Sequence, residues 1–167
     1  LLSLAMRQPV REDLRFIFSV THIITDLERL GDEAVNISEK TLALLGAPLL
    51  QPLVDIPHMG RLVTSMLRNC LQAFGKNDAP LALEVILQDN EVDALYEKIF
   101  RDVMAQLIAD GTIEEDRMCR GTALILISRY LERSGDHAVN IATRTFFMIT
   151  GKRLPDRRFA LDSKTSS

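Results

Sequence analysis

The chain has 167 residues, of which 47% are hydrophobic and 26% charged, a balance typical of compact globular domains that excludes a mostly disordered chain. Its formal net charge of −3 argues against a nucleic-acid-binding surface, because such surfaces need an excess of Lys and Arg facing phosphates. No apolar run approaches the ~18 residues that a membrane-spanning helix requires, and no signal peptide is expected. We therefore expect a soluble, cytoplasmic protein that binds no nucleic acid.

Prolines and glycines gather at a few positions and divide the chain into four segments long enough for helices. Pro9 can open the first helix, and three prolines within 46–57 interrupt the chain. Further turns are expected at 75–80, 110–111 and 151–155. Apolar residues recur every three or four positions, and no segment alternates with a period of two. The sequence therefore predicts an all-α fold with helices at 10–45, 58–74, 79–109 and 113–150.

The residues available for the core are mainly aliphatic, because the chain has no Trp and only 5% aromatic residues. Cys70 and Cys119 each lie singly within an apolar segment and have no metal-binding spacing. Both are predicted to be reduced thiols in the core.

An internal repeat relates two of the expected helices. Residues 27–37 read LERLGDEAVNI and residues 131–141 read LERSGDHAVNI, which agree at nine of eleven positions. By the same offset of 104 residues, the helix that should precede the first copy begins before residue 1, and residues 1–7 look like its end. We therefore expect the first repeat to lack roughly 50 N-terminal residues. The predicted domains are a remnant of the first repeat at 1–46, a proline-rich linker at 47–57, a complete three-helix repeat at 58–150 and a C-terminal tail at 151–167.

The first long helix should have an uncovered apolar face, because two helices of its repeat are missing. Phe16, Ile17, Val20 and Ile24 are expected on this face. The prediction is exposed apolar surface, dimerisation or exchange of this helix between chains.

Acidic pairs occupy equivalent positions in the two copies, with Glu28 and Asp32 in the first and Glu132 and Asp136 in the second. Residues four apart lie on the same side of a helix. Glu132 falls on the apolar side of its helix. Burying an unpaired carboxylate costs several kcal/mol, so such a residue must be protonated, paired with a cation or bound to a metal.

A third acidic row, formed by Asp89, Asp93 and Glu97, follows four-residue steps in 79–109. Like charges at this spacing repel each other by about 0.2–0.5 kcal/mol per pair, so the row should be compensated. If the helices 79–109 and 113–150 pack antiparallel across the turn at Gly111, this row lies at the height of the row in the second copy. The side chains expected to converge are Asp89, Asp93, Glu132 and Asp136. Carboxylate oxygens are hard ligands that suit Mg, Ca, Mn or Fe.

The acidic rows have a competing interpretation as salt-bridge partners of Arg29, Lys98, Arg129 or Arg133. Their occurrence in three helices favours a cation site. Gly31 and Gly135 precede the aspartates of the two copies, and the missing side chain at each allows either another helix or a ligand to approach. His137 is replaced by Glu33 in the first copy, so a ligand role for it is not favoured.

The LERxGDxAVNI element, together with the row of Asp89 and Asp93 on the preceding helix, resembles the PhoU family of phosphate-transport accessory proteins over about residues 1–150. The resemblance implies tandem three-helix bundles whose N-terminal repeat is incomplete in this chain. It also implies metal binding by the acidic rows, with the metal open between iron, zinc, manganese and magnesium. The implied ligands are Glu28, Asp32, Asp89, Asp93, Glu132 and Asp136, with Asn36, Asn140 and Glu97 as further candidates.

The resemblance further implies a function in regulation and no enzymatic activity. The expected protein is a negative regulator of the phosphate-starvation response and a modulator of phosphate uptake. It would be a homodimeric adaptor between the ATPase subunit of the phosphate ABC transporter and a sensor histidine kinase, and it would reach the membrane only through these partners.

Two alternatives to a metal-binding regulator stay open. The first is a metal-free helical adaptor or scaffold protein. The second is a di-iron helical-bundle enzyme, which requires the pattern Glu-x-x-His, whereas glycine stands three residues after both Glu28 and Glu132. No nucleophile with an adjacent base and no phosphate-binding loop is recognisable in the sequence.

Overall fold

Four long helices make up the described part of the computed structural model, which comprises residues 11–46, 50, 55–109 and 114–154. These residues contain no β-strand, so the predicted all-α fold is confirmed. None of the described helices is long and apolar enough to cross a membrane. In chain order the helices are α2 (Arg11–Ala43), α3 (Asp55–Lys76), α4 (Ala79–Ala109) and α5 (Glu115–Thr150).

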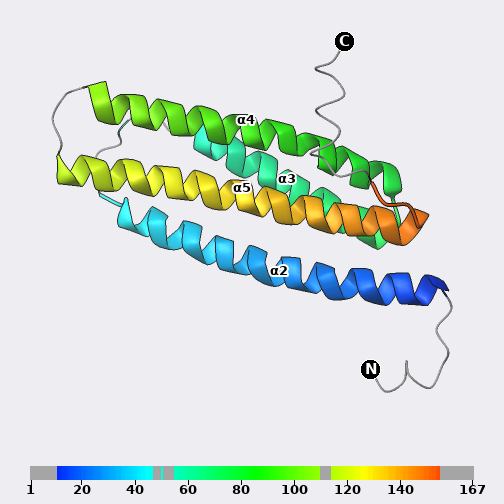
Figure 1. The fold of residues 1–167 in the computed structure, drawn as a ribbon. Coiled ribbons are helices and arrows are strands. Elements are labelled where there is room, and N and C mark those ends of the chain that lie inside the picture. The colour runs from blue at the N-terminus through cyan, green and yellow to red at the C-terminus, as the bar shows by residue number, and fades with distance from the viewer. Residues whose placement is uncertain (1–10, 47–49, 51–54, 110–113, 155–167) are drawn as a thin grey trace, which may run out of the picture.

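The central helix is α5, against which all the others pack (Figure 1). It forms a three-helix bundle with α3 and α4, while α2 lies along its other side. The α4 and α5 helices are antiparallel, as predicted, because Leu107 lies against Gly121 and Asp89 lies against Gly135. Among the described helices, only α5 has a backbone close to that of α2. The position of α2 therefore depends chiefly on its contacts with α5.

The core of the bundle is aliphatic, as its composition predicts. Met59, Met66, Val85, Val92 and Ile141 are fully buried. In α4 the buried residues follow the predicted spacing of three or four, so one face of the helix supplies the core. Each such side chain contributes about 1.5–3 kcal/mol relative to an exposed position.

The two cysteines have different environments. Cys70 is buried, and burial raises the pKa of its thiol to about 12. Cys119 is exposed, so the prediction that it is a core thiol is wrong. It lies with Glu115 and Thr122 on the outward side of α5, whereas Ala123 on the same helix is buried. Apolar neighbours in the sequence therefore did not determine its side of the helix.

The helix ends agree with the proline and glycine positions except at the start of α3. This helix begins at Asp55, three residues before the expected start at residue 58, so residues 55–57 of the expected linker are helical. Pro57 lies in the first turn of α3, where a backbone N–H has no partner within the helix and proline is tolerated. At the other predicted boundary, Gly151 ends α5 in the left-handed conformation, with a φ of 69°.

One face of α2 exposes apolar residues, which confirms that part of the prediction for this helix. Phe16 is 51% exposed and Ile24 is 59% exposed, whereas Ile17 and Val20 are half-buried, so the prediction holds for two of the four residues named. Leu27 is also exposed, whereas Leu131, its equivalent in the repeat, is half-buried against the core. Dimerisation through this face stays a prediction. Residues 1–7 and positions 155–167 of the expected tail lie outside the described residues.

Candidate functional site

The α4 and α5 helices bring four of the predicted carboxylates into one neighbourhood. The evidence is the pKa of Glu132, which is raised first by burial of its carboxyl and next by the charge of Asp136. Arg129 lowers this pKa, while Asp93 and Asp89 raise it further. We call Asp89, Asp93, Glu132 and Asp136 the carboxylate cluster. Its charges repel each other, which favours binding of a proton or a cation.

Burial divides the carboxylate cluster into an inner and an outer part. Asp89 is 2% exposed, and the side chain of Glu132 is 14% exposed. Asp93 and Asp136 are exposed to solvent. Exposed side chains change rotamer readily, so the outer pair can adjust to a bound ion, while the inner pair is held between the helices.

The salt-bridge interpretation accounts for one oxygen of Glu132. Arg129 Nη1 donates to Glu132 Oε1 at 2.7 Å, whereas Glu132 Oε2 is buried and accepts no hydrogen bond from the described residues. Lys98 is engaged elsewhere, with Asp55, at 2.7 Å. Arg129 therefore compensates the carboxylate of Glu132 only in part.

The cluster is close in space without forming a ready coordination sphere. In the described ranges, no three His, Cys, Asp or Glu side chains are arranged as ligands of one metal ion. The donor chemistry fits a hard cation, because all four groups are carboxylates and one buried oxygen of Glu132 lacks a hydrogen bond. A metal here would require the outer side chains to reorient.

The remaining predicted acidic residues are not among the groups that raise the pKa of Glu132. Glu28 and Asp32 are exposed on α2, and no carboxyl of α2 is among the groups that raise the pKa of Glu132. Glu97 is exposed and pairs with Arg101 at 3.5 Å. These residues are accessible but are not held against a second acidic row within the described part of the chain.

The two asparagines named as further candidates have acidic partners outside the carboxylate cluster. Asn140 donates to Asp26 Oδ1 at 3.3 Å, across the interface between α5 and α2. Asn36 donates to Glu33 Oε2 at 3.5 Å. Both amides therefore donate hydrogen bonds to acidic residues of α2 and not to the carboxylate cluster.

The two glycines of the repeat have different surroundings. A Cβ atom at Gly135 would lie 3.3 Å from Asp89 Oδ1 and 3.4 Å from Val92 Cγ1, so this glycine lets α4 approach α5 closely. A Cβ atom at Gly31 would meet no atom within 4 Å. Of the two interpretations of Gly135, the close approach of another helix is therefore the one that the structure supports.

This difference predicts opposite effects of alanine at equivalent positions. Gly31→Ala should raise the free energy of unfolding by about 0.5–1 kcal/mol, because alanine has the higher helix propensity and meets no atom. Gly135→Ala should lower it by about 1 kcal/mol, because the added methyl group crowds two buried side chains. Chemical denaturation of both variants measures the two changes. Equal changes at the two positions would contradict the packing at Gly135.

The raised pKa of Glu132 predicts a pH dependence in the metal-free protein. A carboxyl whose pKa rises on folding stabilises the fold below its ordinary value of 4.5, and this contribution is lost as pH rises through the folded-state pKa. Glu132→Gln cannot ionise, so its stability relative to the parent should increase between pH 4 and pH 7. Urea denaturation in chelator across this range measures the effect. The exposed Glu84→Gln is the control, for which a much smaller change is expected.

A buried polar seam between α2 and α5 was missed by sequence reasoning. A hydrogen bond of 2.9 Å joins His137 Nδ1 and Asp26 Oδ1, and both residues are buried. Arg133 pairs with Glu33, which is also buried, at 3.1 Å. The sequence did contain a signal for this seam, because polar residues of α2 recur at a spacing that places them on one face of the helix. The residues of α2 on this face are Ser19, Ile23, Asp26, Leu30 and Glu33.

The structure is that of a helical-bundle protein in which two helices carry the same acidic motif and two neighbouring helices hold a cluster of carboxylates. The chain belongs to the PhoU family, because the family model described as PhoU domain matches residues 1–41 and 56–145. This finding confirms the resemblance seen in the sequence.

Relatives of known sequence and structure support the assignment. The chain is 36% identical to a phosphate-specific transport system accessory protein PhoU homolog of Zymomonas mobilis, over 92% of this chain and 63% of the relative. It is 38% identical to the homolog of Clostridium acetobutylicum, over 90% of this chain and 68% of that protein. The chain thus spans about two thirds of the length of these relatives.

Two solved structures share the fold. The crystal structure of PhoU from Pseudomonas aeruginosa is similar with a TM-score of 0.83 and 35% identity, over 89% of this chain and 70% of that one. The phosphate transport system regulatory protein PhoU from Streptococcus pneumoniae gives a TM-score of 0.80 and 30% identity, over 93% and 70%. The helical architecture is therefore that of the family.

Proposed function

We propose that this chain acts in a regulatory accessory protein of phosphate-specific transport, which restrains the phosphate-starvation response when phosphate is plentiful. The observation that carries the proposal is the family match over two segments, 1–41 and 56–145. The relatives named above are described as accessory or regulatory proteins of phosphate transport. The proposed role is regulation by binding, with no catalytic turnover.

The proposed mode of action is that of an adaptor. Its partners would be the ATPase subunit of the phosphate ABC transporter and a sensor histidine kinase, and the protein would act at the cytoplasmic side as a homodimer. Exposed apolar side chains support a role in protein contacts, because contiguous apolar surface is characteristic of interaction sites. On α4 one group recurs at four-residue steps and consists of Phe100, Met104 and Ile108.

The proposed metal site is the carboxylate cluster between α4 and α5. Asp89 and Glu132 would supply the inner ligands, and Asp93 and Asp136 the outer ones. A bound cation would neutralise the repulsion between these groups and link the two helices. The row of Glu28 and Asp32 on α2 is the equivalent half-site of the first repeat. A metal-free adaptor is the competing proposal.

The regulatory proposal is tested by deleting the gene and measuring alkaline phosphatase in phosphate-rich medium. We expect phosphatase activity to rise several-fold, because a negative regulator is removed, and to return to the parental level when the gene is restored. The same strain grown without phosphate should show little further increase. Unchanged phosphatase activity on deletion would contradict the regulatory function while leaving the fold assignment intact.

A further inference from the structure

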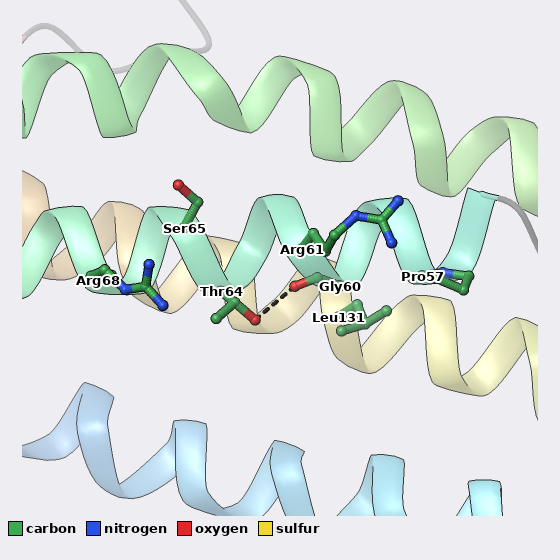
Figure 2. A pocket seen from close by; sticks show the side chains of 7 residues that line it. All are labelled: Pro57, Gly60, Arg61, Thr64, Ser65, Arg68 and Leu131. Atoms are coloured by element: carbon green, nitrogen blue, oxygen red, sulfur yellow. Dashed lines mark hydrogen bonds between the residues drawn. The ribbon is translucent and has the colours of Figure 1, made fainter.

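A hollow of about 650 Å³ on the surface of α3 has a basic lining (Figure 2). The α3 helix provides two arginines and two hydroxyl side chains, and Leu131 of α5 lies beneath them. The hollow lies on the α3 side of α5, whereas the carboxylate cluster lies between α4 and α5. The polar lining residues are Arg61, Thr64, Ser65 and Arg68.

The helical spacing gathers these side chains on one face. Arg61 and Arg68 are seven residues apart, which is two turns or about 10 Å along the helix axis. Thr64 and Ser65 lie between them (Figure 2). Gly60 lines the same hollow, and a Cβ atom there would meet nothing within 4 Å. The absent side chain therefore helps to keep the hollow open.

The two arginines are available to a ligand. Both are exposed, and neither has an ion-pair partner in the described ranges. Other arginines of the same helical bundle, such as Arg101 and Arg129, pair with a carboxylate. An arginine pair without carboxylates is notable in a chain whose net charge is −3.

The hydroxyl groups differ in what they can donate. Thr64 Oγ1 already donates its proton to the carbonyl oxygen of Gly60 at 2.7 Å. Ser65 and the two guanidinium groups are therefore the donors left for a ligand. The described lining residues include no carboxylate, so these donors favour an anion, and guanidinium groups bind phosphoryl oxygens in pairs.

We propose that this hollow binds a small polyanion that carries at least two phosphoryl groups. Its volume lies within the 300–1,000 Å³ of typical small-molecule sites and is several times that of a single phosphate ion. A chain of phosphoryl groups can contact Arg61 and Arg68 together, whereas one phosphate ion satisfies both only if their side chains converge. The described lining residues include no aromatic ring, so a nucleotide base gains no stacking contact.

The test is calorimetric titration of tripolyphosphate into the purified chain at low ionic strength with EDTA present, so that no metal bridges the ligand to carboxylates. We expect tripolyphosphate to bind at least about tenfold more tightly than orthophosphate, and ATP to bind no more tightly than tripolyphosphate. Arg61→Gln and Arg68→Gln should each weaken binding by about tenfold or more, because each removes a charge-assisted hydrogen-bond donor. Higher salt should also weaken binding.

The matched control is Arg101→Gln, which removes the same charge from an exposed arginine on α4. It should leave tripolyphosphate affinity unchanged, and all three variants should keep the parental melting temperature. The proposal is overturned if the parent does not bind tripolyphosphate, if Arg101→Gln weakens binding as much as the other two, or if ATP binds more tightly than tripolyphosphate. The titration needs no transporter or kinase, so its failure would leave the proposed regulatory function untouched.

Discussion

Replacing His137 with alanine is expected to lower the free energy of unfolding by about 3–5 kcal/mol, because it leaves a buried acidic residue without its main partner. His137 Nδ1 and Asp26 Oδ1 are 2.9 Å apart and both residues are buried. Asn140 also contacts Asp26 Oδ1, but at the longer distance of 3.3 Å. For a chain of this size the loss corresponds to a fall in Tm of roughly 6–20 °C. Thermal and urea denaturation measure it.

A second histidine–carboxylate pair on the same molecule provides the control. His58 and Glu91 are 3.5 Å apart, and both side chains are largely exposed. Exposed ion pairs contribute about 0–1 kcal/mol, so His58→Ala should change stability little. If His137→Ala cost no more than His58→Ala, the buried pair would not hold α2 to α5.

The buried pair of His137 and Asp26 also predicts which helix should lose stability first in the His137→Ala variant. Among the described helices only α5 has a backbone close to that of α2, and the ring contact of Phe16 with Phe74 of α3 lies outside 19–33. Weakening the seam should therefore release α2 before the bundle of α3, α4 and α5 unfolds. Amide hydrogen exchange should therefore accelerate within 19–33 more than within α4. Replacing Asp26 and His137 together with leucine should be far less costly than His137→Ala, because no buried charge is left behind.

The helix positions could be predicted from the sequence because proline and apolar spacing act locally. The expected helix 79–109 coincides with α4. The start of α3 could not be placed in this way, because Pro57 disrupts a helix interior but is tolerated in a first turn. Cys119 was misplaced for a related reason: its apolar neighbours lie along the chain, whereas burial depends on the direction that a helical position faces.

The carboxylate cluster could also be predicted from the sequence. A short connection makes consecutive helices antiparallel, and counting from the turn at Gly111 places Asp93 and Glu132 at similar heights. The buried seam between α2 and α5 could not be predicted in this way, because Asp26 and His137 are 111 residues apart. Their contact depends on how α2 is rotated about its axis, and α2 has apolar residues on both its buried and its exposed sides, such as Ile23 and Ile24.

The final prediction concerns metal binding by the carboxylate cluster. A cation that binds only the folded protein should stabilise it by about 2.7 kcal/mol at a concentration one hundred times its Kd, a rise in Tm of roughly 5–10 °C. Asp136→Asn keeps the shape of the side chain but removes the charge that raises the pKa of Glu132. In chelator the variant should therefore melt above the parent, because repulsion is relieved. When metal is added it should gain less than the parent, because a ligand has been weakened.

The opposite signs of these two effects separate a metal site from a salt-bridge network. The matched control is Asp102→Asn, because Asp102 is also exposed, lies on α4 outside the carboxylate cluster and is not among the groups that raise the pKa of Glu132. This variant should gain as much from metal as the parent does. Melting curves with Mg, Mn, Fe and Zn in turn, each against chelator, measure the gain. If the parent gains from none of them and Asp136→Asn melts lower in chelator, the carboxylates are partners of basic residues such as Arg129, and the metal site is wrong.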